Sequence, residues 1–140
     1  MATSHTMTQT TPPIWARTLL GGAAAAAVNL GVYLAGTAAG ASMVVSDPNP
    51  MTIPWPAAIV ASILPLALGG VVAWLLAKRK PAARVWLAWA GLVFALVSCA
   101  ALIGAPDTAT ALSLGAMHVV AGAAWFAALT VKTKDRRVRP

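Results

Sequence analysis

Four long apolar runs, separated by short polar segments, constrain the fold of this chain more than any other feature. They occupy residues 19–41, 57–77, 85–105 and 110–131, and none contains Asp, Glu, Lys or Arg. Each is close to the roughly 20 residues that an α-helix needs to cross the hydrocarbon core of a bilayer. Backbone groups inside lipid must bond to one another, which favours helices. The predicted fold is therefore all-α, an integral membrane bundle of four transmembrane helices.

Composition agrees with this prediction. The 140 residues are 59% hydrophobic and only 9% charged, against roughly a quarter charged in an ordinary soluble domain. So few charges could not cover the surface of a water-soluble fold. The length allows one domain. The formal charge of +7 could suggest a nucleic-acid partner, but the cations flank the apolar runs, so no nucleic-acid partner is expected.

Polar segments mark the limits of the membrane domain. Residues 1–13 are Thr-rich and end in a proline pair, which predicts a disordered N-terminal segment. Prolines at 48, 50, 54 and 56 predict an exposed loop, because proline lacks the backbone donor that a helix needs. The membrane domain is therefore expected over residues 14–131, followed by a basic tail over residues 132–140.

The basic residues predict the orientation. Lys and Arg near the ends of spans stay on the cytoplasmic side, and one assignment puts all ten there, with both termini cytoplasmic. The loops on the opposite side contain no Lys or Arg, and their only charged residues are Asp47 and Asp107. The basic face is expected to contact anionic lipid headgroups. The ten are Arg17, Lys78, Arg79, Lys80, Arg84, Lys132, Lys134, Arg136, Arg137 and Arg139.

A cleaved signal peptide is the alternative for the first run. Arg17 precedes the run, and Ala39, Gly40 and Ala41 resemble a cleavage site. The run is longer than the roughly 7 to 15 residues of a signal h-region. We therefore expect it to remain attached.

Few polar side chains lie within the runs, and three define the candidate site. Counting about 1.5 Å per residue from the cytoplasmic end puts Asn29 roughly 15 Å deep, and Ser98 and His118 about 18 to 20 Å deep. Pro65 lies at the same depth and is expected to kink its helix. The pattern predicts one polar layer near mid-membrane. It serves either as interhelical hydrogen bonding or as a site that binds a proton or a ligand.

Small residues indicate which faces pack. Gly36 and Gly40 share a face with Asn29, and Gly115 and Gly122 flank His118 at helical spacing. Small residues let helices approach closely. We therefore predict that Asn29 and His118 point into the bundle.

The chain carries no recognisable catalytic or cofactor motif. It has no G-x-S-x-G, P-loop or G-x-G-x-x-G sequence. One intramembrane His and one Cys are too few ligands for a metal or haem site. No catalytic residue, metal or cofactor is therefore expected.

The order of features resembles a family of small four-helix membrane proteins of unknown function from actinobacteria. The similar features are an alanine-rich first run with Asn29, a proline-bearing second run, the basic turn 78–84, Ser98, and the pair Met117-His118. The resemblance implies a plasma-membrane location, which in a bacterium is the inner membrane, and no particular activity.

The functional expectation is a non-enzymatic accessory, structural or partner-binding membrane protein, as a homo-oligomer or with another membrane protein. The alternative is a small oligomeric transporter or channel that uses the layer of Asn29, Ser98 and His118. A third class, a membrane enzyme or redox subunit, lacks a catalytic cluster. The three classes differ in what they require of the interior: a dry core of small residues, a polar cavity, or a bound cofactor.

Overall fold

The computed structural model describes residues 12–45 and 49–131, and its chain is helical apart from one short hairpin. The predictions of disorder for residues 1–11 and of a basic tail lie outside the described residues. The all-helical class is as predicted. The helices of the first, second and fourth apolar runs begin and end within five residues of those runs, whereas the third run is divided between two helices. In chain order the elements are α1 Ile14–Ala38, β1 Val44–Val45, β2 Met51–Thr52, α2 Trp55–Arg79, α3 Ala83–Ser98, the 3₁₀ helix η1 Cys99–Gly104 and α4 Thr108–Thr130.

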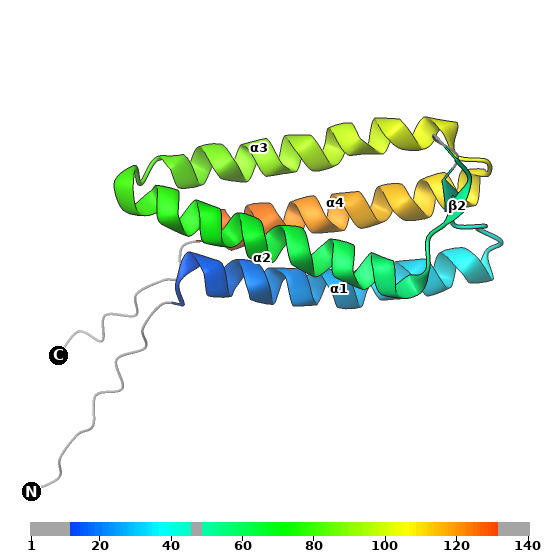
Figure 1. The fold of residues 1–140 in the computed structure, drawn as a ribbon, viewed down its shortest axis with the longest axis horizontal. Coiled ribbons are helices and arrows are strands. Elements are labelled where there is room, and N and C mark those ends of the chain that lie inside the picture. Colours follow the sequence, from blue (N-terminus) through cyan, green and yellow to red (C-terminus); the bar gives the residue numbers. More distant parts are fainter. Residues whose placement is uncertain (1–11, 46–48, 132–140) are drawn as a thin grey trace, which may run out of the picture.

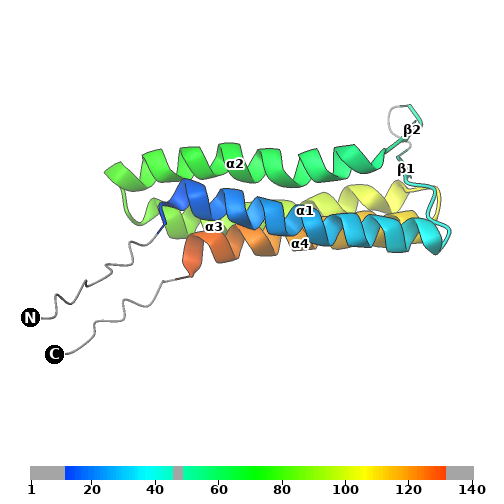
Figure 2. The same cartoon turned by 90° about the horizontal axis from the view of Figure 1, so that it is seen from below.

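The four α-helices lie side by side, each running opposite to the one before it (Figures 1 and 2). α1 packs along both α2 and α4, and α3 packs along α4. α2 and α3 follow each other in the sequence but touch much less. The packing order is therefore α2, α1, α4, α3, and α1 and α4 form the centre.

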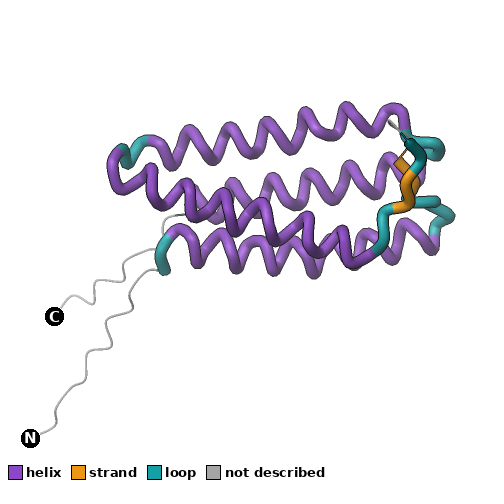
Figure 3. The backbone as a smooth tube through the Cα atoms, viewed as in Figure 1, coloured by secondary structure: helices purple, strands orange, loops and turns teal. Residues whose placement is uncertain are grey.

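Loops and the hairpin lie at the two ends of the helices (Figure 3). We call them the hairpin end, which holds β1 and β2, and the termini end, from which both chain ends depart (Figure 1). β1 and β2 pair antiparallel, with Val44 opposite Thr52 and Val45 opposite Met51.

Gly40 ends α1 rather than packing against another helix, so its predicted packing role is wrong. Its φ is +90°, and a side chain built there would meet nothing within 4 Å. The Gly40 N–H donates to Thr37 O at 3.1 Å, and the Ala41 N–H to Gly36 O at 2.9 Å. This pair of bonds is the Schellman motif, which requires the left-handed conformation that glycine adopts freely. Gly40 therefore satisfies carbonyls that the helix end would leave unpaired.

The third apolar run is not one continuous α-helix. α3 has 16 residues, and the chain continues as the six-residue η1. α1, α2 and α4 are each long and apolar enough to cross a membrane, whereas α3 alone is shorter. A 3₁₀ helix rises about 2.0 Å per residue against about 1.5 Å in an α-helix. α3 and η1 together therefore extend about 36 Å.

Many of the buried positions hold small residues, and large apolar residues cover the outside. Ala73 and Ala88 have 0% of their surface exposed, whereas Trp86 is 77% and Phe94 74% exposed. A water-soluble protein would bury its aromatic side chains and place charges outside. This chain instead exposes aromatic and large aliphatic side chains along its helices, as expected where lipid surrounds them.

Candidate functional site

Asn29 is the centre of a polar cluster that joins three helices. It lies on α1 and is 2% exposed. Its Nδ2 donates to Ser62 Oγ on α2 at 2.8 Å and to the Met117 carbonyl oxygen on α4 at 3.3 Å. The prediction that Asn29 points into the helices is confirmed. Its amide connects both of the helices against which α1 packs.

Ser62 determines which way the Asn29 amide faces. The Ser62 hydroxyl donates its only hydrogen to Ala58 O at 2.7 Å, so its oxygen can only accept from Asn29. The Met117 carbonyl likewise can only accept. Both contacts therefore require the Asn29 NH₂ group, and Asn29 Oδ1 faces elsewhere. That oxygen is buried, and no donor among the described residues reaches it.

Ser98 and His118 do not join this cluster through their side chains. Ser98 Oγ donates to Phe94 O at 2.8 Å, and His118 Nδ1 lies 2.8 Å from Leu114 O. Each contact joins a side chain to its own helix one turn earlier. The structure brings Asn29 to the backbone beside His118. The hydrogen bonds of the Ser98 and His118 side chains among the described residues stay within their own helices, so in this layer it is Asn29 that bonds to other helices.

The rotation of α4 explains this difference. Met117 is buried among residues of α2 and the loop after α1. His118 shares a stripe with Gly115 and Gly122, whose nearest neighbours are Leu102 of η1 and Ala95 of α3. Consecutive helical residues lie about 100° apart. His118 is therefore half-buried on the side of α4 that faces α3.

Ser62 is the functional candidate that sequence reasoning missed. It is the only polar side chain in the apolar run 57–77, which was the signal available. Pro65, selected instead, is exposed and lies inside the unbroken α2. A proline marks a weakened helix but does not say which face packs. Ser62, one turn after Ala58, lies on the buried face with it.

The remaining glycines differ in how closely their neighbours approach. A side chain on Gly122 would meet the Ala95 Cβ at 2.7 Å, and one on Gly36 would collide with Ser113. Gly115 has room, since its nearest neighbour is Leu102 at 3.8 Å. Gly91 allows Trp125 of α4 to lie against α3, where its indole Nε1 donates to Leu87 O at 2.8 Å. Gly36 and Gly122 are thus tight packing positions, and Gly115 is not.

A second polar network closes the hairpin end. Asp107 caps α4 by accepting from the Thr110 N–H at 2.6 Å and from Thr110 Oγ1 at 2.9 Å. It also accepts from the Ser42 hydroxyl and, at 3.3 Å, from the Ser42 N–H. These bonds lower the pKa of Asp107 to about 2, and the bond from the Ser42 hydroxyl has the largest effect. We call Ser42, Asp107 and Thr110 the latch, because they join the end of the α1 segment to the start of α4.

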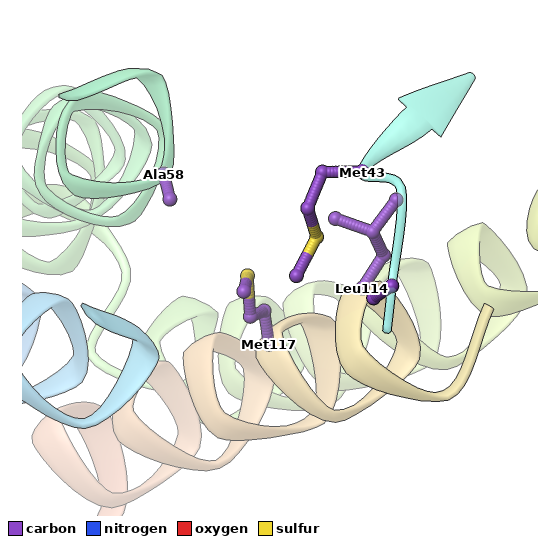
Figure 4. Close-up of a cluster of buried hydrophobic side chains, with 5 residues drawn as sticks. Met43, Ala58, Leu114 and Met117 are labelled. Carbon is purple, nitrogen blue, oxygen red and sulfur yellow. The ribbon is translucent and has the colours of Figure 1, made fainter. Parts of the chain in front are cut away.

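Met43 follows the latch and is inserted between helices. Its N–H donates to Thr110 Oγ1 at 2.9 Å, and its carbonyl oxygen accepts from the Ile53 N–H at 2.8 Å. Its side chain is 1% exposed and extends toward Met117 and Ala58 (Figure 4). Its φ is +52°, a left-handed conformation that costs a side-chain-bearing residue roughly 1–2 kcal/mol. The latch bonds hold this strained residue in place.

The termini end is cationic. The Arg17 guanidinium donates to Val131 O, which ties the start of α1 to the end of α4. Lys78 Nζ lies 3.6 Å from the ring centroid of Trp74. Arg84, at the start of α3, is near enough for its charge to act on Arg17. Every described Lys and Arg therefore belongs to the termini end, and Asp107 to the hairpin end.

Comparison with known proteins identifies a family. Residues 9–135 match the model of a family described as a family of unknown function, DUF6069. The chain belongs to the DUF6069 family. No curated protein and no solved structure matches it.

The DUF6069 match includes all four α-helices, the Asn29 cluster and the latch. These features therefore belong to one family domain rather than to an added segment. Among residues 12–45 and 49–131, no three His, Cys, Asp or Glu side chains are grouped so that they could hold a metal ion. What the described arrangement offers is hydrogen bonding: two neutral oxygens, of Asn29 and Ser62, inside a tightly packed interior.

Proposed function

We infer that this DUF6069 protein is a four-span membrane protein of the plasma membrane, with a structural or partner-binding role rather than an enzymatic one. The observation that carries this proposal is the distribution of side chains. Bulky apolar residues such as Trp86, Phe94 and Leu68 are exposed, whereas the buried positions hold alanines, the Asn29 cluster and a few Met and Leu side chains, with no Trp, Tyr or Phe among the buried residues of the described chain. Lipid suits such an exterior, and a neighbouring membrane helix suits it equally.

The fourth span consists of α3 and η1 together. Their combined length of about 36 Å exceeds the roughly 30 Å of the hydrocarbon core. Since α1, α2 and α4 are each long enough alone, four crossings follow. An even number of crossings puts both chain ends on the same side.

That side is the cytoplasmic one, because the termini end carries Arg17, Lys78, Arg79, Lys80 and Arg84. These cations have no acidic partner among the described residues of that end. Anionic lipid headgroups are the partner of matching charge, and exposed Trp15 and Trp86 are suited to the same interfacial depth.

The packing of α1 favours a scaffold over a channel. A side chain on Gly70 of α2 would collide with Thr18 of α1, and one on Gly22 of α1 would lie 3.3 Å from the Ile63 Cα. Such close approach, on the termini side of Asn29, leaves little space between α1 and α2 for a water path that would cross the whole membrane. The same packing supports a first span that stays attached, because cleavage after Ala41 would remove one side of the Asn29 cluster.

A small oligomeric transporter is the second candidate, and the buried, unpaired Asn29 Oδ1 is the observation that favours it. An acceptor in hydrocarbon is costly unless something bonds to it. In a scaffold this unpaired acceptor only lowers stability, whereas in a binding site a ligand can donate a hydrogen bond to it.

Reporter fusions test the topology. Fusions at Pro50 and Asp107 should report the external side, and fusions at Pro81 and Pro140 the cytoplasm. Intact mass should include the N-terminal segment, with or without Met1. A cytoplasmic signal at Pro50, or a mature chain beginning at Ser42, would contradict the four-span proposal.

Cross-linking in intact membranes tests the role. Photoreactive groups at exposed Leu68 and Phe94 should capture a protein, either a second copy or a partner, whereas a group at buried Ala73 should capture none. Capture of lipid alone at both exposed positions would contradict a partner-binding role.

A further inference from the structure

Asn29 Oδ1 is the one buried side-chain nitrogen or oxygen without a hydrogen-bond partner in the part of the chain that the structure describes. Leaving a buried acceptor unpaired is costly, because the atom has lost its hydrogen bonds to water and gained none in return. The amide cannot relieve this by flipping, because its NH₂ group already serves Ser62 and Met117. The missing partner must therefore be a donor from outside the described residues.

Ser62 supplies a second acceptor beside it. Its hydroxyl hydrogen goes to Ala58 O, and one oxygen lone pair accepts from Asn29. A hydroxyl oxygen has two lone pairs, so one remains. Asn29 and Ser62 together thus offer two neutral acceptors and no spare hydrogen. A molecule that fits them is small and carries two donor hydrogens, as water does.

Met43 separates this pair of acceptors from the hairpin end. Met43, Met117 and Ala58 belong to one buried cluster, and the carbonyls of Met117 and Ala58 accept hydrogen bonds from Asn29 and Ser62. Above Met43 lies the latch, which holds the Met43 N–H through Thr110. Along this path the order is latch, Met43, the carbonyls of Met117 and Ala58, and then Asn29.

We call the described arrangement, with Met43 buried and the latch bonds formed, the closed form. The backbone strain at Met43 favours release of residues 41–45 from this arrangement. A left-handed methionine relaxes when its loop moves away, so loop release recovers part of the strain. Latch hydrogen bonds to a carboxylate oppose that release. The loop is therefore balanced between strain that favours opening and polar bonds that favour closure.

We propose that Asn29 and Ser62 form a binding site for one water-sized hydrogen-bond donor, which enters from the hairpin end when the Met43 loop is released from Asp107. The site needs no charged group and no second chain. It is an addition to the membrane role proposed above, and its tests in detergent do not depend on orientation in a bilayer.

Nuclear magnetic resonance in detergent micelles tests the bound donor, with water as the probe. The chain has two asparagines, Asn29 and Asn49, so an Asn49→Ala variant labelled with ¹⁵N-asparagine and ¹⁵N-tryptophan has a single side-chain amide signal. That signal should show a nuclear Overhauser effect from long-lived water. The Trp125 indole, whose N–H is already bonded to Leu87 O, is the internal control and should show none. Absence of the effect at Asn29 would overturn the site.

Cysteine labelling in detergent tests the route. In a Cys99→Ser background, Ser62→Cys places a thiol at the site, and a charged, water-soluble thiol reagent measures access. Asp107→Ala should raise the labelling rate about tenfold or more, the effect of losing one or two hydrogen bonds from the closed form. Met43→Ala should raise it by a similar factor for a different reason, because it removes the buried side chain that fills the route. Thr108→Ala, on the same turn, is the matched control and should leave the rate unchanged.

A second control separates opening from unfolding. A cysteine at exposed Leu64 on α2 should react at the same rate in all of these variants, and circular dichroism and gel filtration should be unchanged. If the labelling rate of Ser62→Cys is the same with and without Asp107→Ala or Met43→Ala, the proposed route is wrong. Parallel increases at residues 62 and 64 would show general loosening and would also overturn it.

Discussion

The two ends of this molecule are closed by opposite kinds of interaction. At the hairpin end, one carboxylate accepts hydrogen bonds from two residues and holds a strained methionine in place. At the termini end, cations from three helices lie together, and the Arg17 bond to Val131 is the described link between α1 and α4. The hairpin end is complete by itself. The termini end depends on what surrounds it, and an anionic bilayer surface would complete it.

The largest expected effect is at Met43. Met43→Ala removes a fully buried side chain and should lower the free energy of unfolding by about 2–5 kcal/mol. The strain at this position is unchanged, because alanine also carries a Cβ. Met51→Ala, on a residue of β2 that is 61% exposed, should change it by about 0.5 kcal/mol or less. Thermal unfolding of both variants in neutral detergent measures this. Equal effects would mean that Met43 does not hold the hairpin end together.

Asp107 should give the hairpin end a pH dependence at acid pH. Its pKa in the folded chain is about 2, below the roughly 3.9 of an unfolded aspartate. Its contribution is therefore fully present above about pH 4 and is lost as pH falls toward 2. Melting temperatures of wild type and Asp107→Asn from pH 7 to pH 2 should converge at the acid end. The difference at pH 7 should be small, because asparagine also caps helices well.

The termini end should respond to lipid charge and salt instead. Arg84→Gln should stabilise slightly or change nothing in neutral detergent, because it removes repulsion from Arg17. Interactions between exposed charges typically change the free energy of unfolding by about 0–1 kcal/mol. In vesicles with anionic lipid the wild type should gain stability over the variant, and about 0.5 M salt should abolish that gain. A lipid-independent difference would contradict the proposed headgroup contact.

His118 should give the smallest effect. Its ring contacts Leu114 O on its own helix, so His118→Gln should alter unfolding free energy by about 0.5 kcal/mol or less. Asn29→Leu should cost more, because it leaves the Met117 carbonyl and the Ser62 hydroxyl without their donor. Thermal unfolding compares the two. If His118→Gln lowers the unfolding free energy more than Asn29→Leu does, His118 rather than Asn29 is the main polar residue of the site.

Much of the fold followed from local features. Pro54 and Pro56 mark the start of α2, the cations at 78–80 mark its end, and Asp107 caps α4. These signals act within one helical turn, so they can be read along the chain. α1 ended slightly earlier than expected because Gly40, taken for a packing residue, terminates it.

The candidate site was only half predictable. Asn29 stood out because an amide in an apolar run must find partners. Ser62 was overlooked and His118 overestimated, since the choice depends on how α2 and α4 are rotated about their axes. That rotation is decided by contacts such as those of Gly70 with Thr18 and Gly122 with Ala95.

The amino-acid sequence by itself determined the number of helices, their approximate limits, and the collection of cations at one end. Hydropathy, charge and proline act residue by residue, so their effects can be added along the chain. Only the tertiary structure decided the packing order α2, α1, α4, α3, the partners of Asn29, and the insertion of Met43. These depend on how closely two helices approach and which faces they turn to each other, and such distances arise from many contacts together.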